Sequence, residues 1–226
     1  MLSRKLLIGI FGFVAAAMLA VVAFFVLDSR AEKAREAEAV ASVQIEEITL
    51  PPVSEMLQER VLGNADISLY VVSSFTCGHC ANFHKNIFPL LKREYVDTGK
   101  IQIVYADYPL DAPAFAATMI SRCVPREHYW NFVDSLFANQ AKWGYSANVQ
   151  GALISYARLT GLKEVNAKAC LESRDLLYGL SERRQQLSDI YSINSTPSFI
   201  IRKGDRFTIV KELHRYEQLQ KAIDEF

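Results

Sequence analysis

The sequence has no net charge and few cysteines, and both shortages exclude classes of protein. Its 25 Lys and Arg residues balance 25 Asp and Glu residues, whereas a nucleic-acid-binding protein carries a basic excess, so we expect no nucleic-acid partner. Four cysteines in 226 residues are too few for a disulfide-dense scaffold. With 50% hydrophobic and 22% charged residues, the composition predicts a globular protein rather than a disordered one.

The longest stretch without charge lies near the start of the chain. Residues 6–27 are all apolar, and a helix of this length extends about 33 Å, enough to cross a bilayer core of about 30 Å. The apolar region of a cleaved secretory signal is shorter, roughly 7–15 residues, and precedes small residues. Here the run ends in Phe24-Phe25-Val26-Leu27. We therefore expect residues 1–27 to be an uncleaved membrane anchor, with a cleaved signal as the alternative.

The rest of the chain divides into a linker and one globular domain. Residues 28–50 are rich in Ala, Glu, Lys and Arg and end at Pro51-Pro52, which predicts an exposed stalk closed by residues that stop a helix. We assign 28–59 to the linker and 60–226 to the domain. Hydrophobic periodicity predicts the order strand, helix, strand, then a block of helices, then two strands and a helix, over residues 67–73, 78–97, 100–105, 112–192, 198–202, 207–210 and 216–226. Pro89 predicts a kink or break in the first helix.

The motif with the most chemical meaning is Cys77-Gly78-His79-Cys80, which follows a predicted strand and opens a predicted helix. A helix N-terminus offers unpaired amide donors and the positive end of the helix dipole, and both favour a thiolate at Cys77. Cys80 lies on the same helical face one turn further on, so the two cysteines can form a disulfide. A protonated His79 adds positive charge near the Cys77 sulfur. A lower thiol pKa stabilises the reduced pair and makes the disulfide more oxidising.

Three other interpretations of the motif are weaker. A zinc site needs about four ligands, whereas Cys123 and Cys170 stand alone. Covalent haem attachment requires His directly after the second cysteine, and residue 81 is Ala. A purely structural link between Cys77 and Cys80 closes too small a loop to stabilise much. We therefore favour redox chemistry and expect neither a metal nor a cofactor.

With these residues, the chain resembles the DsbA-like thiol–disulfide oxidoreductases of the thioredoxin superfamily over residues 60–226. The resembling segments are 74–80, 104–110 and Ser195-Thr196-Pro197-Ser198-Phe199. The resemblance implies an α/β thioredoxin-like fold with the helical block 112–192 as an insertion. It also implies that Pro197 is a cis-proline facing the active-site cysteines, with Thr196 beside the sulfurs and pairing with the substrate backbone. An ordinary trans-proline that opens a strand is the alternative.

Two departures from the family pattern concern the redox potential. Family members often carry an acidic residue six positions before the first cysteine, where this chain has Val71, so the proton route to the buried cysteine is in doubt. The central pair Gly78-His79 is that of protein disulfide isomerases rather than the Pro-His of the best-known DsbA. This resemblance implies a potential between about −120 mV for DsbA and about −180 mV for the isomerase.

The two remaining cysteines lie 47 positions apart in the helical block. Some DsbA-like proteins carry a second disulfide in this region, and this resemblance implies a structural disulfide between Cys123 and Cys170. Two buried free thiols or a second redox relay are the alternatives.

The expected function is that of a membrane-anchored oxidoreductase that introduces disulfides into exported proteins through Cys77 and Cys80. We expect it in the bacterial inner membrane with the catalytic domain facing the periplasm or cell exterior, and family resemblance implies a DsbB-like membrane protein as the reoxidant. The alternatives are a disulfide isomerase or reductase of the same superfamily, or a thioredoxin-like module that binds copper or zinc.

Overall fold

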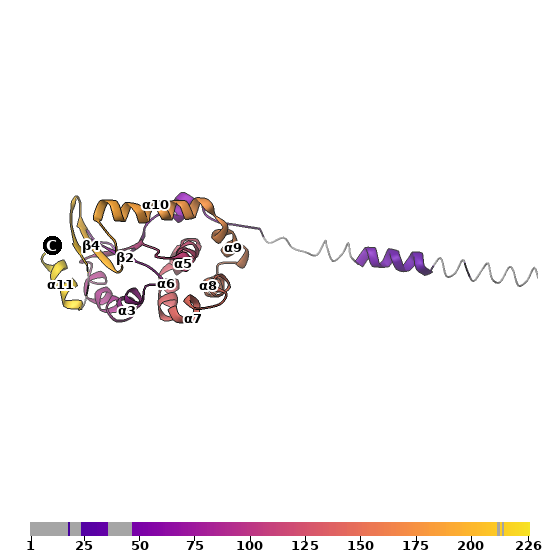
Figure 1. Cartoon of the computed structure of the whole chain (residues 1–226), viewed down its shortest axis with the longest axis horizontal. Coiled ribbons are helices and arrows are strands. Elements are labelled where there is room, and N and C mark those ends of the chain that lie inside the picture. Colours follow the sequence, from indigo (N-terminus) through magenta and orange to yellow (C-terminus); the bar gives the residue numbers. More distant parts are fainter. Residues whose placement is uncertain (1–17, 19–23, 36–46, 212, 214) are drawn as a thin grey trace, which may run out of the picture. The chain divides into compact units, whose positions relative to one another are not determined.

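The computed structural model describes residue 18 and residues 24–35, 47–211, 213 and 215–226. The chain divides into two units, Met1–Glu47 and Ile48–Phe226, and the second is drawn with its labelled elements in Figure 1. In the first unit, residues 24–35 form a helix. Within the described part of the chain, no helix is both long enough and apolar enough to span a bilayer. Most of the predicted anchor, residues 6–27, lies outside the described residues.

The second unit is built on a five-stranded sheet in the order β1-β3-β2-β4-β5. Strands β2 and β3 are parallel, and the other neighbouring pairs are antiparallel. The parallel pair is the βαβ unit that the sequence predicts. The strands are β1 (Arg60–Leu62), β2 (Ser68–Ser73), β3 (Gln102–Asp107), β4 (Ser198–Lys203) and β5 (Arg206–Val210). The short edge strand β1 was not predicted.

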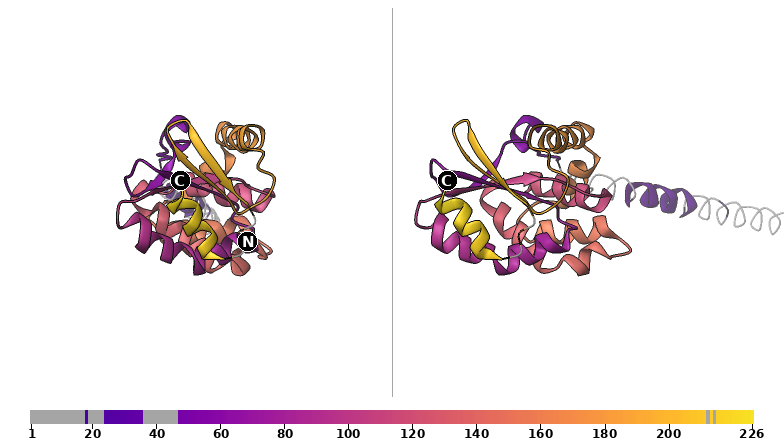
Figure 2. Two further views of the ribbon diagram at one scale, coloured as in Figure 1. Left: turned by 90° about the vertical axis from the view of Figure 1, so that its left-hand side faces the viewer. Right: turned by 60° about the vertical axis from the view of Figure 1, so that its left-hand side comes forward.

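Helices cover both faces of the sheet, as the views in Figure 2 show. On one face, side chains of β2 such as Leu69 and Val71 pack with Phe83 and with Leu219 of α11. On the other face, Val72 packs near Leu187 of α10 (Arg174–Tyr191). The helices on the first face are α3 (Gly78–Asn86), α4 (Phe88–Leu91), the π-helix η1 (Lys92–Val96) and α11 (Tyr216–Asp224). The predicted helix 78–97 is therefore broken next to Pro89.

The helical block follows β3 and forms a second core around Phe132, Leu136 and Trp143, all of which are fully buried. Its helices are α5 (Ala112–Cys123), the 3₁₀ turn η2 (Arg126–His128), α6 (Tyr129–Ala138), α7 (Gln140–Gly144), α8 (Val149–Arg158), α9 (Glu164–Glu172) and α10 (Arg174–Tyr191). This mixed α/β architecture with a helical insertion is the predicted fold class. The short helix α7 was not predicted.

The globular unit begins at Ile48 rather than near residue 60, where we placed the end of the linker. Thr49 exchanges hydrogen bonds with Asn166, whose side-chain oxygen accepts from the Thr49 N–H at 2.9 Å. Helix α2 (Val53–Met56) then buries Met56 in the core of the helical block. The neighbouring Leu57 fits against α10 because residue 179 is Gly, since a Cβ there would lie 2.5 Å from Leu57.

Candidate active site

Cys77 lies at the N-terminus of α3, directly after the turn that follows β2. It is the N-cap residue, and its Sγ accepts a hydrogen bond from the backbone N–H of Cys80 at 3.4 Å. An N-cap side chain satisfies one of the amide donors that a helix leaves unpaired at its start. Cys77 is half-buried and Cys80 is 1% exposed, and both are free thiols. The structure therefore describes the reduced form of the pair.

The loop before β4 lies against the Cys77 sulfur. The Thr196–Pro197 peptide bond is cis, and Cys77 Sγ lies 3.3 Å from the Thr196 carbonyl oxygen, to which the protonated thiol donates a hydrogen bond. A cavity of about 280 Å³ adjoins this contact. It is lined by His79, Asn82, Phe83, Ile87, Ser195, Thr196, Pro197 and Leu213. The structure thus brings together the cysteine motif and the proline loop, which are more than a hundred residues apart in the sequence.

The two cysteines have opposite pKa shifts. The pKa of Cys77 is lowered to about 5. The largest cause is a hydrogen bond from the Cys80 thiol; burial opposes the shift, and the Thr196 side chain and the backbone N–H groups of Cys80 and His79 add to it. The pKa of Cys80 is raised, first by burial and then by the neighbouring Cys77. Near neutral pH, the reduced pair is therefore a Cys77 thiolate beside a Cys80 thiol.

His79 contributes to this thiolate through its backbone. Its side chain is exposed, and its contribution to the low Cys77 pKa comes from its backbone N–H. Gly78 is likewise exposed. The backbone N–H groups of the first turn therefore add to the larger contribution of the Cys80 thiol in stabilising the thiolate at the N-cap.

Gln140 is a functional candidate that sequence reasoning missed. Its side-chain nitrogen donates hydrogen bonds to the carbonyl oxygens of Phe75 at 2.8 Å and of Cys77 at 3.0 Å. Gln140 is the first residue of α7, so the helical insertion holds the turn that carries the nucleophilic cysteine. The sequence gives no signal for this contact, because it joins residues 63 and 65 positions apart.

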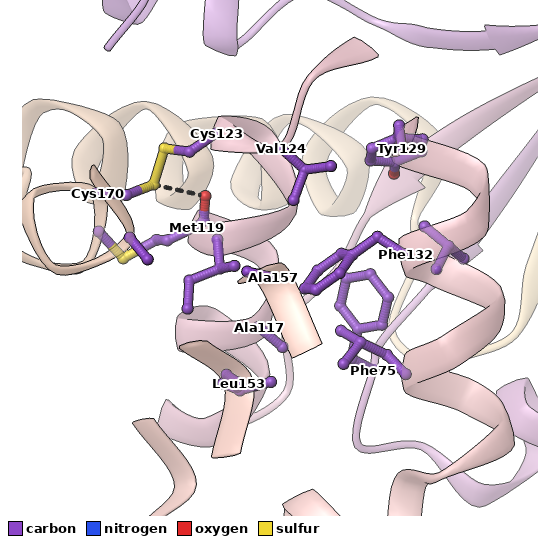
Figure 3. Close-up of a cluster of buried hydrophobic side chains, with 14 of the residues drawn as sticks. Phe75, Ala117, Met119, Cys123, Val124, Tyr129, Phe132, Leu153, Ala157 and Cys170 are labelled. Atoms are coloured by element: carbon purple, nitrogen blue, oxygen red, sulfur yellow. Dashed lines mark hydrogen bonds between the residues drawn. A yellow bond between two sulfur atoms is a disulfide. The ribbon is translucent and has the colours of Figure 1, made fainter. Parts of the chain in front are cut away.

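Cys123 and Cys170 form a disulfide within the helical block. Figure 3 shows the bond at the end of α5, beside Met119. The sulfurs belong to the buried cluster of the helical block. This pair links α5 to α9.

Comparisons with known proteins agree with the fold described above. A family model described as Thioredoxin matches residues 56–225. The solved structure of alpha-DsbA1 from Wolbachia pipientis superposes with a TM-score of 0.68 at 26% identity, covering 78% of this chain and 92% of that one. The structure of oxidised BdbD from Bacillus subtilis superposes with a TM-score of 0.66, covering 79% of this chain and 96% of that one. At 19% identity, this second match supports the fold alone.

Curated sequence relatives point to the same family. A Rickettsia typhi protein provisionally named a protein-disulfide oxidoreductase is 28% identical over 169 residues, or 74% of this chain and 61% of that protein. A Rickettsia prowazekii protein with the same provisional name is 29% identical and is covered to 60%. The chain thus spans about three fifths of the length of these relatives. It belongs to the thioredoxin family, and its fold is similar to that of the DsbA protein from Wolbachia pipientis.

Proposed function

We propose that this protein oxidises pairs of thiols in exported proteins by donating the Cys77–Cys80 disulfide. The observation that carries the proposal is the position of Cys77 at the N-cap of α3, where its Sγ accepts a hydrogen bond from the Cys80 N–H at 3.4 Å. In keeping with this geometry, the pKa of Cys77 is lowered to about 5 and that of Cys80 is raised. A stabilised thiolate favours the reduced form of the site, and a site that prefers to be reduced gives up its disulfide readily.

The reaction begins when a substrate thiolate attacks the Cys77 sulfur in the oxidised site. The Cys77–Cys80 bond breaks, a substrate–Cys77 disulfide forms, and the electron pair stays on Cys80, which takes up a proton. A second substrate thiolate then attacks the substrate sulfur of this mixed disulfide, and Cys77 leaves as a thiolate. The substrate has lost two electrons, and the active site has gained them.

Attack at Cys77 rather than Cys80 follows from access and leaving-group chemistry. Cys77 is half-buried, whereas Cys80 is 1% exposed. The low pKa of Cys77 also makes it the better leaving group in the second step. The cavity beside Pro197 is lined by Thr196, whose carbonyl oxygen lies 3.3 Å from the Cys77 sulfur. An extended substrate segment would lie there, pairing with the backbone of Thr196.

For the whole protein we propose an anchor in residues 6–27 and a catalytic domain on the outer face of the bacterial inner membrane. Continuous turnover needs an acceptor for the two electrons, for which we propose a DsbB-like membrane protein. Protease treatment of spheroplasts tests the topology: loss of residues 48–226 is expected, and full protection would refute it.

The test of the activity is the equilibrium of the full-length protein with a glutathione redox buffer, following the Cys77–Cys80 couple. A potential above about −180 mV is expected, because the protein would then donate its disulfide to exported chains. A potential near about −270 mV, the value of thioredoxin, would refute the oxidase and favour a reductase.

A further inference from the structure

The buried part of the second unit holds more positive than negative charge. Apart from His84, which pairs with Asp134, the charged side chains that the described residues bury are those of Arg60, Arg122 and Asp107. All three are at most 4% exposed. Burying a charge is costly, so buried charges are normally paired. Two cations beside one carboxylate leave one positive charge without a buried counter-charge.

The hydrogen bonds identify Arg60 as the cation that lacks a partner. Asp107 Oδ2 accepts from Nε of Arg122, at 2.7 Å, and from its Nη2. Arg122 Nη1 donates to the Gln58 carbonyl oxygen at 2.8 Å. Arg60 Nη2 donates to the Arg122 carbonyl oxygen at 2.8 Å. Its Nε and Nη1 are buried and have no hydrogen-bond partner among the described residues.

The neighbours of Arg60 do not balance its charge. Its guanidinium lies over the ring of Tyr129, 5.2 Å from the ring centroid, and a ring face accepts no hydrogen bond from N–H groups in the guanidinium plane. The pKa of Arg60 is lowered to about 10, first by burial and then by the positive charges of Arg122 and Arg126. Arg60 is still protonated near neutral pH. Because arginine has only donors, the missing partner is an acceptor with negative charge.

Arg60 lines a cavity of about 470 Å³, a size typical of small-molecule sites. The charged side chains around this cavity are mostly basic: Arg60, Arg122, Arg126 and Lys163 against Glu55 and Glu127. The two glutamates are exposed, so water and salt screen their charges more than that of the buried Arg60. The cavity therefore favours an anion.

The start of α9 lies at the same cavity, which Gly161, Leu162, Lys163 and Asn166 also line. The first amides of a helix have no acceptor within the helix and carry partial positive charge, so anions bind there. The N-cap residue of α9 is Lys163. Its ammonium group has only donors and cannot accept from these amides. Two independent sets of donors, Arg60 and the first turn of α9, thus border one space.

We propose that this cavity binds a phosphate ester, held by Arg60, Arg126 and the first backbone amides of α9. A phosphate group offers oxygens to donors from several directions, and both arginine side chains and helix N-termini are common phosphate ligands. It supplies the negative charge that Arg60 lacks. The cavity shares no lining residue with the one beside Pro197. The site therefore goes beyond the proposed function, which uses neither Arg60 nor this cavity.

The binding test uses the full-length protein in nanodiscs of phosphatidylcholine, titrated calorimetrically with sn-glycerol 3-phosphate in a buffer without phosphate. Sodium chloride at equal ionic strength is the control for screening. The variants Arg60→Met and Arg126→Met each replace a guanidinium by an unbranched apolar side chain. Arg174→Met is the matched control, because Arg174 is exposed in the first turn of α10 and is not among the residues that line the cavity.

We expect one saturable site per chain in the wild type and in Arg174→Met. The affinity should be at least about tenfold lower in Arg60→Met and in Arg126→Met, since each loses charge-assisted hydrogen bonds. Glycerol 3-phosphate should raise the melting temperature of the wild type but not that of Arg60→Met. Without ligand, Arg60→Met should melt no lower than the wild type, because Met removes a buried charge that has no counter-charge.

Two results would overturn the site. One is a wild type that shows no saturable binding beyond the sodium chloride control. The other is equal affinity in all four proteins, which would indicate non-specific attraction. Arg126 is exposed, so Arg126→Met decides the matter if Arg60→Met does not fold. The redox equilibrium of Cys77 and Cys80 with glutathione should be the same in all four proteins, so failure of this site leaves the proposed oxidase untouched.

Nanodiscs that also contain phosphatidylglycerol distinguish two sources of the phosphate. If the headgroup of an anionic lipid fills the cavity, glycerol 3-phosphate should no longer bind in these discs, a result that also rests on the proposed membrane anchor. If the natural ligand is a soluble phosphate ester, glycerol 3-phosphate should bind with the same affinity in both kinds of disc.

Discussion

The lowered pKa of Cys77 predicts how the redox equilibrium of the protein responds to pH. The equilibrium constant K for oxidation of the protein by glutathione depends on how many protons each form holds. The reduced site loses the Cys77 proton as the pH rises through about 5, whereas the disulfide has no thiol to titrate. Glutathione thiols have an ordinary pKa of about 8.5 and keep their protons in this range. Above the Cys77 pKa, rising pH therefore stabilises the reduced protein and lowers K.

The size of the change follows from that pKa. With a pKa of about 5, K decreases between pH 5 and pH 7 by a factor of (1 + 10²)/(1 + 1), or about 50-fold. Cys77 is half-exposed, so solvent screening weakens the shift. A pKa nearer about 6 would give (1 + 10)/(1 + 0.1), or about tenfold. The expected decrease in K is thus about 10–50-fold, or about 1.4–2.3 kcal/mol. A thiol with the ordinary pKa of 9.0 would give almost no change.

The assay equilibrates the full-length protein with glutathione buffers at several pH values and measures the oxidised fraction after acid quenching and alkylation. The plot of log K against pH should be flat below the Cys77 pKa and fall by about one per pH unit above it. The stability of the reduced protein also depends on this thiolate and rises with pH. The contribution of the thiolate is full above about pH 9 and is lost as the pH falls through the folded-state pKa of Cys77. A K that stays constant from pH 5 to pH 7 would refute the thiolate at the helix N-terminus.

Three further predictions concern the scaffold of the site. Gln140→Leu removes both hydrogen bonds to the active-site turn. Urea denaturation should show that the free energy of unfolding falls by about 1–3 kcal/mol. Gln140→Glu is the comparison that keeps the side-chain length. Replacing Cys123 and Cys170 together by Ala removes about 4 kcal/mol for a loop of this length and should lower the melting temperature by about 8–16 °C. The equilibrium constant K in glutathione buffer should stay unchanged. An unaltered melting temperature would contradict a structural disulfide. Arg122→Leu leaves Asp107 charged and buried, and should cost about 3–5 kcal/mol; replacing both residues by Leu should cost less, which a double-mutant cycle measures.

Local sequence signals were sufficient for the elements that carry the active-site cysteines. The alternation and β-branched content of β2 and β3 mark them as strands, and the cysteine motif between them marks the start of α3. The cis bond before Pro197 required the family resemblance, because most X-Pro bonds are trans. Each of these features was predicted from a short segment of the sequence or from a motif that family members share.

The features that were missed depend on contacts between distant parts of the chain. Strand β1 has three residues and pairs with β3, so it is too short to show a period of its own. Residues 48–59 were assigned to the linker 28–59. Met56 is nonetheless buried in the core of the helical block, and Leu57 packs where Gly179 leaves room on α10. Neither contact has a local signal in the sequence.

Strand register decides how the missing acid at Val71 should be understood. Compared position by position with its family, the chain has an apolar residue where a proton-binding group is common, and this difference alone predicts an isolated Cys80. The parallel pairing of β2 with β3 changes that conclusion, because it sets Tyr105 opposite Val71 and Asp107 opposite Ser73 on the same face. A carboxylate is therefore present near this face of the sheet, carried by the neighbouring strand and held there by Arg122. The register of the sheet, rather than the position-by-position comparison, therefore shows where a carboxylate lies relative to Val71.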